Sequence, residues 1–462
     1  MISKRGTQFS VEPLFMKIYG EKVFSNPFDP EKNFSGCINL GSAETRFPAD
    51  MLEEQFMKLR MKNPSFPDSY GYSNFAGIKN LQIELANLFS NFIAKTPSHH
   101  CVKGPESRVK FLENSFVVTN GAGTAIETLC SSLCDDGEYV IIPSPMYHGF
   151  ANDIEKRFSV KVLPFPLTRH KDASYSIDFD ALEDLYNKYP KNKIRAFMHC
   201  NPHNPTGLIF SSQTTERLIH WCIEKKVHLI SDEIYAQSTF NMKESNPFVS
   251  TWRICQDIEN KVASTNANDL KLALIKSEYR NYVHLVYSFS KDFGLNGFRV
   301  GLVYTENKDL LKALNACSYF TSASTDVQYL LYGMLSDHQF VEKLFTINQA
   351  RANNMYKKVL PILQKHNISV LDPEGGTFIW VNILGALKLD STKLLDPSWI
   401  KQKEMEIWYK CFDEGVCILP SLLFQEQPNG WFRICFTPLE EKYVIEGVNR
   451  IIRALFPLSP SL

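Results

Sequence analysis

The sequence reads YSFSKDFGLNGFRVG over residues 287–301, at the end of the apolar run from Val283 to Tyr287. That run predicts a short buried strand, and the residues after it would emerge at the strand's carboxyl end, where α/β sheets place their chemistry. Lys291 therefore stands among hydroxyls, glycines and Arg299. Removal from water and a nearby cation both lower the pKa of a lysine, which favours an amine that holds an aldehyde cofactor. A surface lysine in a turn is the alternative for Ser-x-x-Lys alone.

Short apolar runs alternate with amphipathic segments over about residues 115–304, and two of those segments, 125–133 and 214–225, have helical spacing. Strands that alternate with helices predict an α/β domain built on a mainly parallel seven-stranded sheet with helices on both faces. The predicted strands lie at residues 116–119, 139–142, 160–163, 196–199, 227–230, 283–287 and 300–303.

A second, smaller α+β domain is predicted after residue 310, because the pattern there becomes helical and then returns to strand-like pieces at 377–381 and 431–436. We predict three segments: 1–57 as the N-terminal part of the small domain, 58–310 as the large domain, and 311–462 as the C-terminal small domain. Two polar segments, 96–107 and 264–280, are predicted to be flexible surface insertions.

Composition favours a cytoplasmic enzyme that acts on small molecules. The chain has 462 residues, and its 50 basic and 50 acidic side chains give a formal net charge of zero, so nothing indicates nucleic acid or an anionic membrane as a partner. The eleven cysteines are scattered without a CxxC pair, which favours reduced thiols and predicts no metal site. Neither a signal peptide nor an apolar stretch of about 18 residues is present.

Three further motifs carry polar groups at the ends of predicted strands. Residues 120–124, NGAGT, follow a strand and open a helix, so their backbone N–H groups could bind an anion, although a tight turn is the simpler interpretation. Asp232 follows a buried strand, where a carboxylate stays ionised only beside a cation, and a helix cap is the alternative. Residues 201–207 read NPHNPTG.

Arg433 lies in the middle of the apolar run 430–436. A guanidinium buried there needs a carboxylate partner, since an unpaired one is costly. The carboxylate of an amino-acid substrate and an internal salt bridge are the two alternatives.

Together these motifs resemble those of the fold-type I pyridoxal phosphate (PLP) enzymes, the aspartate aminotransferase superfamily. Within it the chain is most similar to the 1-aminocyclopropane-1-carboxylate (ACC) synthases, and the resemblance runs from about residue 28 to Arg433. It implies a fold-type I PLP transferase fold, PLP as cofactor, and a homodimer in which Tyr72 reaches the neighbouring active site.

The resemblance also implies a role for each matching residue. Lys291 binds the cofactor and acts as the base, Asp232 pairs with the pyridine nitrogen, and Tyr235 completes the catalytic set. Ala43, Glu44, Tyr72 and Arg433 bind the substrate. The remaining cofactor contacts are the phosphate ligands Ala122, Gly123, Thr124, Ser288, Ser290 and Arg299, the stacking ring of Tyr147, and Asn204, which with Tyr235 bonds the phenolic oxygen.

Glu44 makes physical sense in this scheme, because its carboxylate would hold the sulfonium of S-adenosylmethionine and reject dicarboxylates. The predicted reaction is the biosynthetic lyase conversion of S-adenosylmethionine to ACC and methylthioadenosine. Departures from the family pattern at residues 74–79, NFAGIK, and at Thr45 and Arg46 leave open an aminotransferase that moves an amino group to a 2-oxo acid. A PLP-fold module that binds a ligand without catalysis is the third alternative.

Overall fold

The computed structural model describes residues 2–62, 67–95, 109–170, 174–264, 270–387, 389, 396–425 and 429–457. Its largest sheet contains the seven predicted strands, in the order β2-β10-β9-β8-β7-β3-β4. Only β10 runs antiparallel to its neighbours, so the predicted mainly parallel sheet is confirmed. The strands are β2 (Phe116–Thr119), β10 (Gly301–Tyr304), β9 (Val283–Ser288), β8 (His228–Asp232), β7 (Ile194–Cys200), β3 (Tyr139–Ser144) and β4 (Lys161–Pro166).

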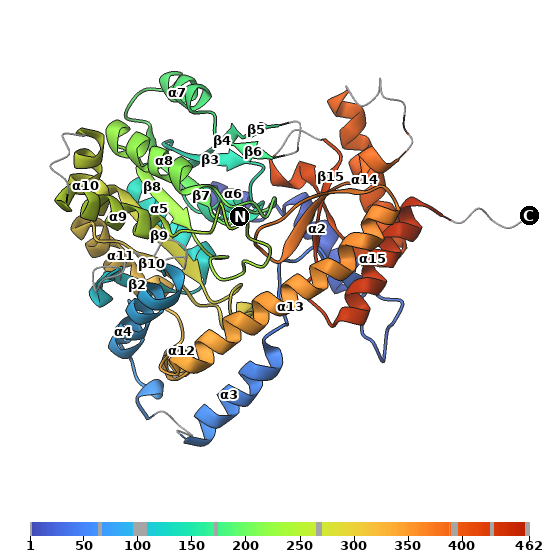
Figure 1. The fold of residues 1–462 in the computed structure, drawn as a ribbon, viewed down its shortest axis with the longest axis horizontal. Coiled ribbons are helices and arrows are strands. Elements are labelled where there is room, and N and C mark those ends of the chain that lie inside the picture. The colour runs from blue at the N-terminus through green and yellow to red at the C-terminus, as the bar shows by residue number, and fades with distance from the viewer. Residues whose placement is uncertain are drawn as a thin grey trace, which may run out of the picture.

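Helices cover both faces of this sheet, because successive side chains of its strands point to opposite sides and nearly all are apolar. Val286 of β9 belongs to the core beside α5 (Ala122–Leu133), α6 (Gly149–Glu155) and α11 (Lys308–Thr321). Leu285 belongs to the core beneath α8 (Ser212–Lys225), α9 (Thr251–Ser264) and α10 (Leu270–Tyr282). Figure 1 shows these helices grouped around the sheet in the larger lobe.

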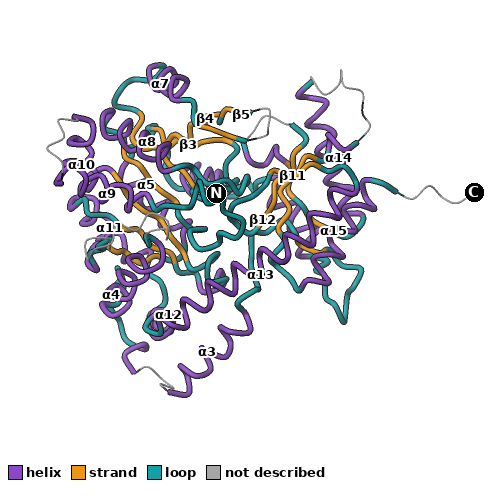
Figure 2. The backbone as a smooth tube through the Cα atoms, viewed as in Figure 1, coloured by secondary structure: helices purple, strands orange, loops and turns teal. Residues whose placement is uncertain are grey.

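The smaller lobe is built on an antiparallel sheet in the order β11-β12-β15-β14. Its strands are β11 (Ser369–Leu371), β12 (Phe378–Asn382), β15 (Trp431–Cys435) and β14 (Leu419–Pro420). Figure 2 shows α14 (Pro397–Asp413) and α15 (Glu441–Leu455) beside this sheet, and α13 (His338–Lys365) running from it to the larger lobe. The strand β1 (Ile38–Asn39) pairs in parallel with β13 (Val416–Cys417), so this early segment of the chain joins the smaller lobe.

The three predicted segments remain a prediction. Residue 310, the predicted end of the large domain, lies inside α11, which packs against α5 and β2 of the larger lobe. The next helix, α12 (Thr325–Leu335), packs against α4 (Lys79–Leu88) and α3 (Ala49–Lys62).

The predicted flexible insertion at 264–280 is wrong for its larger part. Helix α10 begins at Leu270 and packs against α8 and α9, with Ile275 and Tyr279 buried. Ile275 and Tyr279 are four residues apart on one helix face, and this apolar spacing outweighs the polar residues that precede the helix. The other predicted insertion, 96–107, lies outside the described residues.

No helix in the described parts of the chain is long and apolar enough to cross a membrane. Across the same residues, no group of three or more His, Cys, Asp or Glu side chains is arranged to hold a metal ion. The cytoplasmic location stays a prediction.

Candidate active site

A cavity of about 410 Å³ lies at the carboxyl ends of β7, β8 and β9 and is closed from the other side by β15 and the segment after β1. Parallel sheets bind ligands at this edge. Most of the predicted site residues line it: Ala43, Glu44, Ala122, Gly123, Tyr147, Asn204, Asp232, Tyr235, Ser290, Lys291, Arg299 and Arg433. Thr124, Ser288 and Tyr72 do not.

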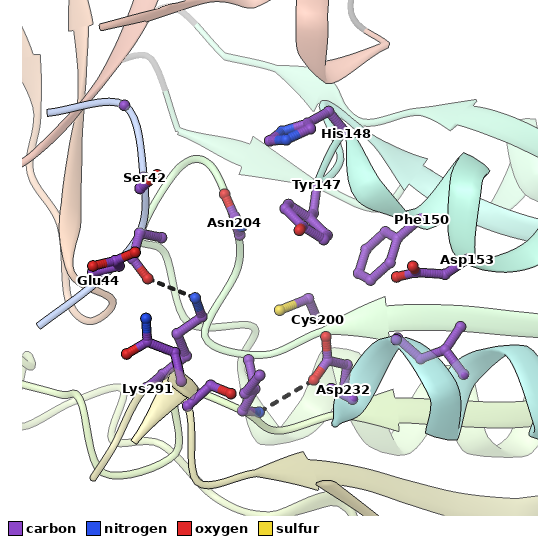
Figure 3. Close-up of a pocket in the computed structure, with 18 of the residues that line it drawn as sticks. Ser42, Glu44, Tyr147, His148, Phe150, Asp153, Cys200, Asn204, Asp232 and Lys291 are labelled. Carbon is purple, nitrogen blue, oxygen red and sulfur yellow. Dashed lines mark hydrogen bonds between the residues drawn. The ribbon is translucent and has the colours of Figure 1, made fainter. Parts of the chain in front are cut away.

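The side chain of Lys291 points into this cavity from the turn after β9 (Figure 3). Its Nζ donates a hydrogen bond of 2.5 Å to the Ala43 carbonyl oxygen. Removal from water, and to a smaller extent the positive charge of Arg433, lower the pKa of Lys291 to about 8. The amine therefore gives up its proton near neutral pH, as a nucleophile or base must.

Asp232 ends β8 and is 4% exposed. One of its carboxyl oxygens accepts a hydrogen bond of 3.3 Å from the Ile234 backbone N–H. Burial raises the pKa of Asp232 to about 7, and no lysine or arginine of the described residues compensates its charge. A ligand that brings a positive charge to this carboxylate would be held by it.

A candidate anion site, which we call the anion site below, lies where β2 turns into α5. Gly121 has φ of +88°, and a Cβ at this position would lie 2.3 Å from Nη2 of Arg299. The guanidinium of Arg299 thus packs against the backbone at the positive end of the helix. Ser290 adds a hydroxyl that accepts a hydrogen bond of 2.8 Å from the buried Ser288, which therefore lies behind the cavity wall.

Arg433 is 1% exposed, and among the described residues it forms no ion pair with a carboxylate. It donates hydrogen bonds of 2.8 Å to Asn204 Oδ1 and 2.6 Å to the Gly41 carbonyl oxygen, and its Nε has no partner. The alternative of an internal salt bridge is therefore not realised. A buried guanidinium whose partners are all neutral is suited to bind the carboxylate of a ligand.

The structure adds cavity residues that the sequence motifs did not indicate. Aromatic side chains of α2 (Leu14–Tyr19) and of helix η1 (Gly20–Phe24) line the cavity. The Tyr19 hydroxyl donates a hydrogen bond of 2.5 Å to Asn39 Oδ1 and forms a second hydrogen bond, of 2.6 Å, with Ser42 Oγ. The spacing of Phe15 and Tyr19 indicates an amphipathic helix, but nothing in sequence connects it to the site. The added residues include Phe15, Met16, Tyr19, Phe24, His148, Asp153 and Cys200.

His148 lies beside Phe15, with ring centroids 4.6 Å apart. Burial lowers its pKa to about 3, and the charges of Arg433 and Lys291 act in the same direction, so this imidazole is neutral at working pH. It contributes hydrogen-bonding capacity to the cavity without charge.

Tyr72 lies outside the cavity and is 97% exposed. Its ring contacts Phe75, which in turn contacts Tyr319, and Tyr319 contacts Phe320. We call these four residues the aromatic patch. A contiguous exposed apolar patch of this kind is typical of an interaction surface.

Comparison with known proteins agrees with this arrangement. The chain is 30% identical to 1-aminocyclopropane-1-carboxylate synthase 7 of Arabidopsis thaliana, over 92% of this chain and 88% of the relative. It is 31% identical to the corresponding synthase of Nicotiana tabacum, over 94% and 82%. Among solved structures, Thermus thermophilus aspartate aminotransferase with maleate superimposes with a TM-score of 0.73 at 16% identity, covering 98% of this chain and 99% of that one.

These similarities confirm the predicted resemblance to the aspartate aminotransferase superfamily and to ACC synthases, the predicted fold-type I transferase fold, and the prediction that the protein is an enzyme. The model of the family described as aminotransferase class I and II matches residues 35–451. The chain therefore belongs to the aminotransferase class I and II family.

Proposed function

We propose that the cavity binds PLP and that the protein is a PLP-dependent enzyme of the ACC synthase type. The observation that carries this proposal is that Lys291 and Asp232 line the same cavity. The pKa of the Lys291 amine is lowered to about 8, and the pKa of the Asp232 carboxyl is raised to about 7. PLP fits both groups and the anion site at once, since it has an aldehyde, a basic ring nitrogen and a phosphate. When bound, it supplies an electron-withdrawing ring that stabilises negative charge at the substrate Cα.

The residues of the chain then have separable tasks. Asp232 keeps a proton on the ring nitrogen, because a buried carboxylate without a cation gains most from that charge. Lys291 takes the proton from the substrate Cα at its Nζ. Tyr235, 2% exposed, and Asn204, 4% exposed, would supply hydrogen bonds to the phenolic oxygen of PLP, and the ring of Tyr147 would stack on the cofactor.

S-adenosylmethionine is the substrate we propose. Its carboxylate would pair with Arg433, and its sulfonium with Glu44, which lines the same cavity and interacts with Lys291. The 30–31% identity with ACC synthases over most of the chain supports this proposal. An aminotransferase remains the second candidate, because Thr45 and Arg46 depart from the synthase pattern directly beside Glu44.

A product assay separates the two candidates. Protein saturated with PLP is incubated with S-adenosylmethionine, and the products are identified by mass spectrometry; we expect methylthioadenosine together with ACC. The Lys291→Ala variant is the matched control and should give neither product. Conversion of PLP to its amine form by common amino acids, without methylthioadenosine, would instead establish the aminotransferase.

We also propose a homodimer whose interface includes the aromatic patch. The exposed fractions of Tyr72, Tyr319 and Phe320 are 97%, 66% and 82%, which is unfavourable for large rings in water. Sedimentation of the wild type should show a dimer, and Phe320→Glu should shift it towards the monomer. A monomeric wild type would refute this assembly.

A further inference from the structure

Asp153 of α6 places an unpaired carboxyl group in the wall of the cavity. Figure 3 shows its side chain extending from α6 towards the cavity, next to Phe150. A Cβ built on Gly123 would lie 3.0 Å from Asp153 Oδ1 and 3.4 Å from Oδ2, so both oxygens stand against the first turn of α5. Within the described ranges, no group donates a hydrogen bond or forms an ion pair with this carboxyl. The carboxyl therefore shares its helix end with the anion site.

The charges around Asp153 come from three directions. Glu127 on α5 repels it, although Glu127 is itself paired with Arg157 at 3.1 Å. Arg299 attracts it from the turn after β9. Asp232 at the end of β8, Tyr147 and the Cys130 thiol of α5 complete the titratable groups that interact with it.

Burial has the largest effect on Asp153 and raises its pKa to about 7; Glu127 adds to this and Arg299 opposes it. The carboxyl thus changes charge within the range in which such an enzyme works. Lys291 and the phosphate of PLP also change protonation state over this pH range. A variant at Asp153 is therefore needed to separate its contribution from theirs.

We propose that Asp153 sets the pH dependence of cofactor retention by competing, when ionised, with the PLP phosphate for the positive end of α5 and for Arg299. This inference rests on the proposed binding of PLP in this cavity. When protonated, the Asp153 carboxyl no longer repels the phosphate and can donate a hydrogen bond to a phosphate oxygen. By linkage, a bound phosphate raises the pKa of Asp153 further, and PLP binding takes up a proton.

The direction of the effect follows from the sign of the charges. Below about pH 7 the carboxyl is neutral and does not oppose the phosphate; above it, one negative charge faces another. The unit charge of an ionised Asp153 would lie several ångströms from the PLP phosphate, where the effective dielectric constant is between those of protein and water. At that distance it changes the affinity for PLP roughly tenfold. Cofactor affinity therefore falls as the pH rises through the pKa of Asp153.

Binding isotherms of the cofactor-free protein test this inference without an activity assay. PLP is titrated into wild type and Asp153→Asn at about pH 6 and about pH 8.5, on either side of the pKa, with protein fluorescence as the readout. The ratio of the two dissociation constants cancels contributions from Lys291 and from the phosphate itself. We expect a wild-type to variant ratio near one at the lower pH and roughly tenfold at the higher pH.

Three controls keep the outcome interpretable. Pyridoxal, which lacks the phosphate, should bind wild type and Asp153→Asn equally at both pH values. Asp184→Asn, which removes an exposed carboxyl from α7 (Phe179–Asn187), should leave the ratio at one. Glu127→Gln removes the repelling neighbour and should move the pH at which wild-type affinity falls to a lower value.

The same ratio at both pH values, or an equal effect on pyridoxal, would overturn the role of Asp153. Failure of the wild type to bind PLP at either pH would instead refute the proposed cofactor, so the two failures are distinguishable. If Asp153→Asn does not fold, the shift expected for Glu127→Gln carries the test, and its absence overturns the inference.

Discussion

Lys291 and Asp232 show how one environment moves two groups in opposite directions. Both lose water in the same cavity, which disfavours the charged form of each, so the pKa of the amine falls and that of the carboxyl rises. Both costs decrease when a ligand brings an aldehyde to the amine and a cation to the carboxylate. Perturbed groups of this kind gather at functional sites because they are stabilised only by the ligand.

Glu44 decides whether the cavity prefers a cationic substrate, and Glu44→Gln tests it. We expect wild type to bind S-adenosylmethionine more tightly than S-adenosylhomocysteine, which lacks the sulfonium charge. The variant should lose roughly tenfold in affinity for the former and little for the latter, because only the charge pair is removed. Competition binding with both ligands measures the effect. Equal losses for the two ligands would contradict a charge-based role.

The residues that sequence could predict are those in continuous motifs. Lys291, Asp232 and Arg433 each follow or lie in an apolar strand that makes a polar side chain conspicuous, and the structure brings all three into one cavity. Asp153 and His148 could not be predicted. Their side chains carry no local signal, and only the packing of α6 against α5 brings Asp153 to the anion site.

At the scale of elements, the strands of the large sheet could be predicted from the sequence, but the position of the N-terminal helix α2 at the cavity could not. Strands such as β2, β3 and β9 are buried on both faces and read as apolar runs, whereas the edge strand β4 has exposed residues at both ends. Helix α2 has six residues, and its position depends on contacts far along the chain, such as the hydrogen bonds from Tyr19 to Asn39 and Ser42. Helix α10 was missed because polar residues precede its apolar face.

The turn into α5 depends on Gly121, and Gly121→Ala should damage the anion site specifically. A Cβ there meets Arg299 at 2.3 Å, and φ of +88° is unfavourable for alanine, so we expect a loss of about 1–3 kcal/mol in stability. PLP affinity should fall as well, since Arg299 must move. Chemical denaturation and PLP titration measure the two effects.

Gly297→Ala is the matched control, because Gly297 lies two residues from Arg299 but a Cβ there would meet no atom within 4 Å. It should change neither quantity appreciably. If Gly121→Ala binds PLP as tightly as Gly297→Ala, the turn does not position the anion site.

For the whole molecule, the cavity is lined by residues from both the large and the small sheet. The large sheet supplies Lys291 and Asp232, and the small lobe supplies Arg433 and, through β1, the segment with Glu44. The groups that we propose to act on the cofactor thus come from one lobe, and Glu44 and Arg433, which we propose to bind the substrate, come from the other. The departures from the synthase pattern at Thr45 and Arg46 lie beside Glu44, whereas those at residues 74–79 lie beside the large sheet, where Ala76 accepts a hydrogen bond from the Val118 backbone N–H of β2.

The stability of the cofactor-free protein should decrease between about pH 6.5 and pH 8. The folded state binds extra protons up to a pKa of about 7 on its buried acids, whereas in the unfolded chain these groups ionise near pH 4, so the free energy of unfolding falls as the pH rises. At lower pH, buried histidines with pKa values of about 3 to 4 act in the opposite direction, which produces a plateau. The acids are the buried Asp232, Glu233 and Asp292 and the half-buried Asp153, and the histidines are the buried His199 and His203 and the half-buried His148 and His228.

Urea denaturation at about four pH values between pH 5 and pH 8 measures this dependence, and each acid contributes at most about 1.4 kcal/mol per pH unit. Asp232→Asn removes one titrating acid. The free energy of unfolding should then decrease less steeply with pH, by the contribution of that one acid. In the Asp153→Asn variant, where the phosphate has no such carboxyl to protonate, PLP should flatten the decrease too, because the cation that it brings to Asp232 lowers the pKa of that carboxyl. A free energy of unfolding that rises from about pH 6.5 to pH 8 would show that these buried acids are ionised throughout, and that Asp232 has no need of a cation from a ligand.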